Sequence, residues 1–250
     1  MNILLIKVTI IPAVIALVTL ATRKWGNKIG GLIGSMPWMA GPILLFFILE
    51  QGKAFGIYAI QGVMTGILAL ISFCISYAMF SRSLSWLPAL LLSYGIYAGT
   101  AMLISQLQLN LLVSYVLVIS VILLTLRFFP VPIGQSTSIR RLPFDIPIRM
   151  IVATLFVLVI TGLAGILGPN WSGILTPFPI ITSVLAIFAH TLQGSNAVIT
   201  TLRGLVIGLL GFTTFLFLQA FLLREFSIAL SFGLAFVVNT LINLIASRVW

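Results

Sequence analysis

The sequence predicts an all-α polytopic membrane protein with about nine transmembrane helices. Of its 250 residues, 61% are hydrophobic and only 6% are charged, and the mean hydropathy is +1.26. A soluble domain carries about a quarter charged residues. At about 20 apolar residues per membrane crossing, the apolar runs fill nearly the whole chain and leave no room for a soluble domain.

Uninterrupted apolar stretches, separated by short polar breaks, predict the individual helices. The first run ends in Arg23 and Lys24 instead of a small-residue cleavage site, so we interpret it as a retained helix and not a signal peptide. The only long hydrophilic connection, at 130–147, is rich in proline. The predicted helices cover residues 3–22, 29–50, 54–80, 85–106, 109–129, 147–167, 172–191, 196–222 and 227–247.

The charges indicate topology and exclude a nucleic-acid partner. The net charge is +10, but Lys and Arg stand at the ends of apolar runs instead of forming one basic surface. With the N-terminus outside and the C-terminus in the cytoplasm, the inner side collects most of them, as the positive-inside rule requires. The inner set is Arg23, Lys24, Lys28, Arg82, Arg127, Arg140, Arg141, Arg149, Arg203 and Arg248, and the outer set is Lys7, Lys53 and Arg224.

A comparison of the chain with itself at an offset of 142 residues predicts an internal duplication. The aligned pairs include Gly31 with Gly173, Pro37 with Pro179, Gln51-Gly52 with Gln193-Gly194, Gly62 with Gly204, Gly66 with Gly208 and Arg82 with Arg224. Coincidence between two apolar sequences is the alternative. We interpret 1–106 and 146–250 as four-helix repeats and 107–145 as a connector helix with a polar loop. One connecting helix inverts the second repeat, as in secondary transporters that bind substrate near the membrane midplane.

Pro37 and Pro179 are the first candidate site residues. Each lies in a Gly- and Pro-rich run, and proline removes a backbone donor and clashes with the preceding helical turn. We therefore expect a break in each helix, facing a path between the repeats, where protein or water satisfies the freed backbone groups. The alternative is that these prolines only begin helices.

Polar side chains within or beside the apolar runs complete the candidate substrate-binding set. Arg203 lies inside a predicted membrane helix, which suggests a functional role. Its charge would then be compensated by Glu50, by backbone carbonyls or by an anionic substrate. The alternative is that its side chain extends to the membrane surface by snorkelling. Glu50 and His190 could exchange protons near a cavity, or both could simply be solvated. Asn239 and Asn243, four residues apart, fit either interhelical hydrogen bonds or ligand contacts. The rest of the set is Glu50, Gln51, Gln61, His190, Gln193 and Arg203.

No catalytic constellation is recognisable. The chain has three acidic residues, one His and one Cys, and Cys74 lies inside an apolar run. This inventory provides no metal ligand set, no phosphate-binding loop and no nucleophile with a base. We expect no enzyme activity, no metal and no cofactor.

The second half resembles the GlpM family of small bacterial inner-membrane proteins. The similar residues are Gly173 to Pro179, including the Phe178-Pro179 pair, then Ala189-His190 and Gly194. The first half departs from this pattern, with Met36-Pro37 and Leu49-Glu50 at the equivalent places. The resemblance implies a bacterial inner-membrane location and a loose link to exopolysaccharide production.

The sequence thus favours a membrane transporter or facilitator with a path between two inverted repeats, for a small anionic or lipid-like substrate. The alternative is a non-transporting membrane subunit that scaffolds or regulates an envelope-biogenesis or transport complex. Expected partners are membrane lipids, the substrate, and either a second copy or other subunits of a membrane complex.

Overall fold

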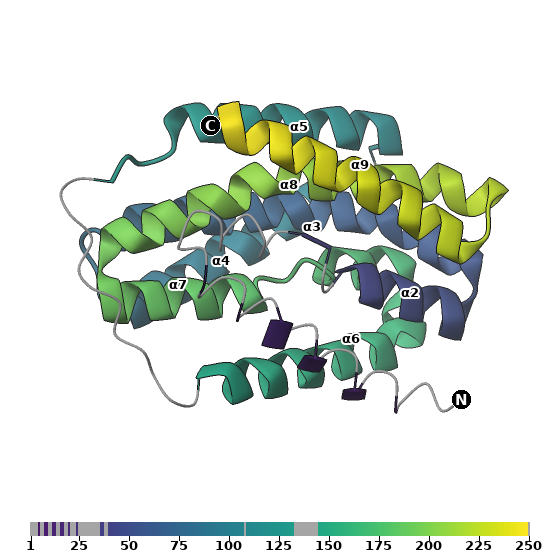
Figure 1. Cartoon of the computed structure of the whole chain (residues 1–250), viewed down its shortest axis with the longest axis horizontal. Coiled ribbons are helices and arrows are strands. Elements are labelled where there is room, and N and C mark those ends of the chain that lie inside the picture. Colours follow the sequence, from purple (N-terminus) through teal and green to yellow (C-terminus); the bar gives the residue numbers. More distant parts are fainter. Residues whose placement is uncertain are drawn as a thin grey trace.

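The computed structural model contains helices and no strand in the part of the chain that it describes, which is residues 36–37, 40–107, 109–132 and 145–249 with isolated positions between 5 and 24. The long helices lie side by side along the long axis of the molecule (Figure 1). They are α2 (Ala40–Gln51), α3 (Lys53–Phe80), α4 (Trp86–Ser105), α5 (Leu111–Phe128), α6 (Asp145–Leu175), α7 (Ile180–Gln193), α8 (Ser195–Glu225) and α9 (Ile228–Val249).

Six of these helices, α3, α4, α5, α6, α8 and α9, are long and apolar enough to cross a membrane. The outer helices expose leucine side chains such as Leu103, Leu124 and Leu244. Large exposed apolar surface of this kind fits a lipid environment and not water. The chain is therefore a multi-pass membrane protein, as predicted, while the first predicted helix and most of the polar connection lie outside the described residues.

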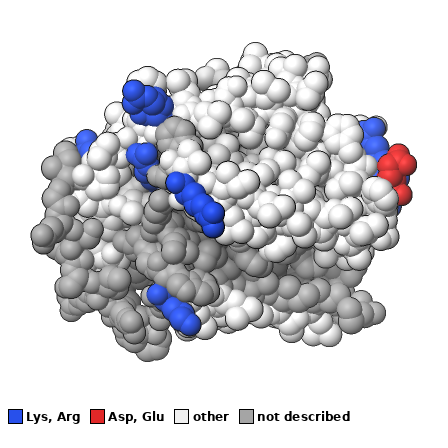
Figure 2. All heavy atoms as spheres, turned by 45° about the horizontal axis from the view of Figure 1, so that its top comes forward, with Lys and Arg blue, Asp and Glu red and all other residues white. Residues whose placement is uncertain are grey.

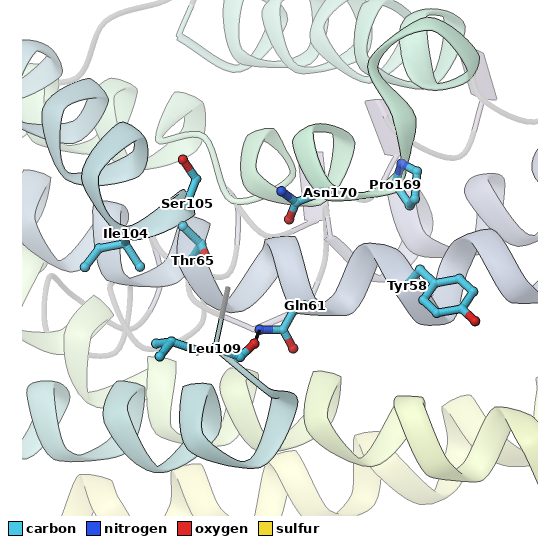
Figure 3. A pocket seen from close by; sticks show the side chains of 8 residues that line it. All are labelled: Tyr58, Gln61, Thr65, Ile104, Ser105, Leu109, Pro169 and Asn170. Carbon is cyan, nitrogen blue, oxygen red and sulfur yellow. Dashed lines mark hydrogen bonds between the residues drawn. The ribbon is translucent and has the colours of Figure 1, made fainter. Parts of the chain in front are cut away.

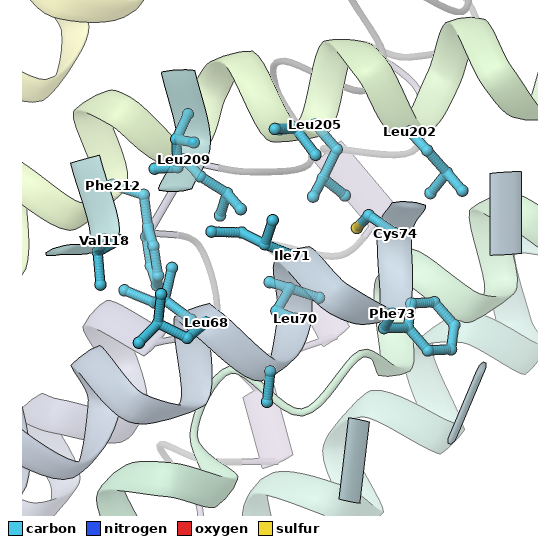
Figure 4. Close-up of a cluster of buried hydrophobic side chains, with 14 of the residues drawn as sticks. Leu68, Leu70, Ile71, Phe73, Cys74, Val118, Leu202, Leu205, Leu209 and Phe212 are labelled. Atoms are coloured by element: carbon cyan, nitrogen blue, oxygen red, sulfur yellow. The ribbon is translucent and has the colours of Figure 1, made fainter. Parts of the chain in front are cut away.

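The centre of the bundle is the pair α3 and α8. In the most apolar stretch of α3, 78% of the residues are buried, against 28% in α4 and 22% in α9. Figure 4 shows the contact, where Leu202, Leu205 and Leu209 of α8 face Ile71 and Cys74 of α3. The labelled side chains at this contact between the two central helices are all apolar or, for Cys74, only weakly polar.

The central helices run antiparallel. At one end, Nζ of Lys53, the first residue of α3, donates to the carbonyl oxygens of Leu223 (3.2 Å) and Phe226 (3.3 Å) at the end of α8. At the other end, Tyr77 lies 3.4 Å from His190, which precedes the start of α8. The ammonium group also stabilises the negative end of the α8 dipole.

Three glycines with positive φ form the joints between helices. Gly52 joins α2 to α3 (φ 93°, ψ 162°), Gly194 joins α7 to α8 (φ 81°, ψ −178°), and Gly168 breaks α6 (φ 72°, ψ 171°). Residues with a Cβ rarely adopt this conformation. The break at Gly168 sets the ends of two predicted helices: 147–167 matches the first part of α6, while predicted helix 172–191 is divided between the second part of α6, residues 169–175, and α7.

Glycine also allows α6 to cross α3 at backbone contact. A Cβ on Gly62 would overlap the carbonyl oxygen of Asn170, and one on Gly66 would overlap the carbonyl oxygen of Ile174. From the opposite side, a Cβ on Gly173 would overlap the carbonyl oxygen of Ala59. Small residues at such crossings are typical of membrane helix pairs.

Candidate functional site

A break interrupts the α6–α7 segment at the predicted position. Helix α6 ends at Leu175 and α7 begins at Ile180, and Pro177 and Pro179, which lie between them, are both buried. Neither proline can donate a backbone hydrogen bond. A break is thus present beside Pro179, and because Pro179 directly precedes the first residue of α7, the alternative that this proline begins a helix fits the structure equally.

This break lies near the middle of the membrane-spanning height. The second part of α6 starts beside Gly62, about a third of the way along α3, and His190, in the last turn of α7, lies beside Tyr77, near the end of α3. The 14 residues of α7 extend about 21 Å, half of the roughly 42 Å of α3. Residues 169–193 thus follow about the last two thirds of α3, and the interruption lies beside Gly66, about halfway along α3.

Aromatic side chains surround the interruption. The ring of Phe178 stacks on Tyr94 with centroids 5.4 Å apart and meets the ring of Tyr97 edge-on at 5.2 Å. It also stacks on Phe156 of α6, at 5.7 Å, and Tyr94 in turn packs against Phe73 of α3, at 5.3 Å. Helices α3, α4 and α6 therefore all contribute to an aromatic cluster centred on Phe178.

A hydroxyl group from α4 replaces one helical hydrogen bond that the interruption removes, and a second hydroxyl from α4 bonds to a side chain of α7. The amide of Phe178 bonds to Leu175 at 3.0 Å instead of Ile174, and the Ile174 carbonyl accepts from the hydroxyl of Tyr97 at 3.0 Å. The Tyr94 hydroxyl donates to Oγ of Ser183 at 2.8 Å. A freed carbonyl inside a membrane needs such a partner.

An open pocket of about 390 Å³ lies between the aromatic cluster and the end of the molecule that holds the α2–α3 joint. Figure 3 shows the side chains that line it. Two lining residues locate the pocket relative to the interruption. Thr65 is followed by Gly66, which contacts Pro177, and Asn170 lies one helical turn before Ile174. The lining comes from α3, α4, α6 and the α4–α5 loop, and consists of Tyr58, Gln61, Thr65, Ile104, Ser105, Leu109, Pro169 and Asn170.

Gln61, a predicted site residue, lines this pocket and also holds α5. Its Nε2 donates to the carbonyl oxygen of Leu109 at 2.7 Å and to Oγ of Ser114 at 2.8 Å. Both amide hydrogens are therefore used, and only the amide oxygen remains to accept a further hydrogen bond.

His190 lies on the other side of the aromatic cluster from the pocket. Its Nδ1 is 3.4 Å from the Tyr77 hydroxyl, and the two rings meet edge-on at 5.9 Å. Gln193 follows one turn later and is half-buried. His190, Tyr77 and Ser183 give this side of the segment its polar groups.

The remaining predicted residues lie elsewhere. Pro37 is buried ahead of α2, and its carbonyl accepts the first helical bond from Gly41. Glu50 and Gln51 are exposed at the end of α2. Arg203 is half-buried about 12 Å from the start of α8, at the opposite end of the bundle, so Glu50 cannot compensate its charge.

Sequence reasoning missed four residues of the site: Tyr94, Tyr97, Phe178 and Asn170. A signal existed for Tyr94 and Tyr97, because tyrosines three residues apart on an apolar helix share a face.

No family model, curated protein or solved structure matches the chain.

Proposed function

We propose that the protein is a membrane transporter or facilitator whose substrate path runs between α3–α4 and α6–α7. The observation that carries this proposal is the interruption at mid-height, held by Tyr97 and Tyr94, with an open pocket directly above it. Irregular backbone at membrane depth is tolerated where protein encloses it or a cavity reaches it, and interrupted helices form the substrate sites of many transporters.

The proposed path has three parts. The pocket receives the substrate, the aromatic cluster around Phe178 closes the middle, and Ser183, Tyr77 and His190 lead to the other end. Passage requires Phe178 to leave its stacked position on Tyr94. The structure is therefore the closed state of this path.

The inverted repeat belongs to the same proposal. Gly52 and Gly194, aligned by the offset of 142 residues, hold nearly the same left-handed conformation between a short apolar helix and a long one. The equivalent helices α3 and α8 run antiparallel, each packs against the helix that follows it, and α5 contacts both. These features support two inverted four-helix units joined by α5, with nine crossings in all.

The distribution of charge supports a cytoplasmic C-terminus. Arg82, Arg127 and Arg248 stand at the helix ends that share one end of the bundle, while Lys53 and Arg224 lie at the other end with the acidic Glu50 and Glu225. Figure 2 shows basic side chains gathered at one end and an acidic group beside basic ones at the opposite end. By the positive-inside rule the first end faces the cytoplasm. A bacterial inner membrane, implied by the resemblance to GlpM, is the proposed location.

The alternative function is a non-transporting subunit of a membrane complex. The dry contact between α3 and α8 favours it, because a path through the exact centre of the bundle is closed by leucine side chains (Figure 4). The two functions differ in whether water reaches the interruption.

Thiol accessibility tests the proposal. The variant Ser183→Cys in a Cys74→Ala background places one thiol on the path, and the native chain is its matched control, since Cys74 is buried in the α3–α8 contact. In liposomes, we expect a small hydrophilic thiol reagent to modify Cys at 183 through transient opening and to leave Cys74 unmodified. Equal resistance of both thiols would overturn the proposed path.

A further inference from the structure

We infer that the pocket lined by Gln61, Ser105 and Asn170 binds an uncharged polyhydroxyl group, either as a free polyol or sugar or as the headgroup of a neutral glycolipid. This inference names a substrate class and rests on the proposed function in taking the pocket as the entrance of the path. Its volume of about 390 Å³ lies within the range of small-molecule sites.

Hydrogen-bond accounting gives the polarity of the ligand. Both amide hydrogens of Gln61 are used on Leu109 and Ser114, and the hydroxyl hydrogen of Ser105 is used on the Met102 carbonyl at 2.8 Å. Each residue can therefore offer only an acceptor to the pocket. A ligand that satisfies both must donate, as hydroxyl groups do.

The other polar groups in the pocket can both donate and accept. Asn170 extends its amide between α6 and α3 (Figure 3), and the hydroxyl of Thr65 lines the wall below it. A hydroxyl group also donates and accepts, so a polyol matches all four of these positions. An ammonium group would match the acceptors but not the donor of Asn170, because it has no lone pair.

The lining excludes a charged ligand. None of the eight lining residues is charged, so an anion or a cation would lose hydration without gaining a counter-charge. The one basic group on the same stretch of α3, Lys53, is bound to the end of α8. The anionic substrate expected from the sequence is thus not favoured at this pocket.

The depth of the pocket suits a headgroup. Gln61 lies about 12 Å along α3, and α3 exceeds a 30 Å hydrocarbon layer by about 12 Å, or about 6 Å at each end. The amide of Gln61 is then about 6 Å below the hydrocarbon boundary. Tyr58, with 69% of its surface exposed, stands at the mouth, where a tyrosine fits the membrane interface.

The experiment measures protection of a reporter thiol. Ile104→Cys in the Cys74→Ala background reports on the pocket, Leu109→Cys is a second reporter in case the first does not fold, and Ser83→Cys, exposed at the other end, is the control. The protein is reconstituted in phosphatidylcholine liposomes alone, with monoglucosyl diacylglycerol, with phosphatidylglycerol, or with free glucose. The rate of modification by a small thiol reagent is compared among the four.

We expect glucosyl lipid, glucose or both to slow modification at the pocket, with no effect at Ser83→Cys. Protection by the lipid alone identifies a headgroup site, and protection by glucose as well identifies a site for the free sugar. Ser105→Ala, which removes one acceptor, should raise the concentration for half-protection about fivefold, the equivalent of one hydrogen bond.

Absence of protection by either neutral compound, or equal protection by phosphatidylglycerol, would overturn the inference. The thiol at 183 separates this failure from that of the proposed function. If it is accessible while the pocket is unprotected, the path stands with another ligand class. If the pocket is protected while the thiol at 183 is inert, the protein binds a polyol and does not transport it.

Discussion

The substitution Tyr97→Phe tests whether the interruption is held shut by a side-chain hydroxyl. The ring is 3% exposed and remains in edge contact with Phe178 after the change, so only the hydrogen bond to the Ile174 carbonyl is lost. An orphaned buried acceptor costs about 1–3 kcal/mol in soluble proteins, and interhelical hydrogen bonds in membranes average about 0.6. We therefore expect about 1 kcal/mol of destabilisation, localised at the interruption.

Two measurements check the effect. Denaturant unfolding in micelles should show the loss of about 1 kcal/mol, and the thiol at 183 should react about fivefold faster, because opening now breaks one hydrogen bond fewer. Tyr115→Phe is the matched control, since its hydroxyl bonds to Thr214 on α8, away from the interruption. Unchanged stability with an unchanged reaction rate in Tyr97→Phe would refute the reasoning.

Three further predictions concern helix contacts. Gly62→Ala should destabilise the protein by about 3 kcal/mol, because its Cβ overlaps the Asn170 carbonyl oxygen. Gly95→Ala, whose Cβ meets no atom within 4 Å, is the control and should be neutral or slightly stabilising in the same unfolding measurement. Lys53→Met should lower stability by about 1–2 kcal/mol by removing two charge-assisted hydrogen bonds at the end of α8, and retention of full stability would show that this contact contributes nothing. Arg203→Lys should match the native protein in expression and orientation, because a snorkelling position requires only a positive charge. If Arg203→Lys is defective and Arg203→Gln is no worse, the guanidinium group makes a specific contact instead.

The sequence predicted those features that local chemistry determines. Paired prolines beside a Gly-rich run predicted the interruption at Pro179, because a missing amide acts on its own turn. The predicted helix ends at 50 and 191 lie within three residues of the joints at Gly52 and Gly194. The bond from Tyr97 to Ile174 joins residues 77 apart, and no periodic pattern encodes such a contact. The left-handed conformation of Gly168 was likewise not predicted, because a Gly-Pro pair indicates a loop but does not give the angle between the helices on either side of it.

The composition of the interrupted segment also has an electrical consequence. Residues 169–193 contain no Lys, Arg, Asp or Glu, and their only titratable side chain is His190, near the end. A membrane potential of 100 mV performs about 2.3 kcal/mol of work on each elementary charge that crosses it. Movement of this segment displaces almost no charge, so the potential across the membrane neither drives it open nor holds it closed. In the proposed mechanism, opening is therefore set by hydrogen bonds, aromatic contacts and the occupant of the pocket, and we expect the same opening rate in energised and de-energised membranes.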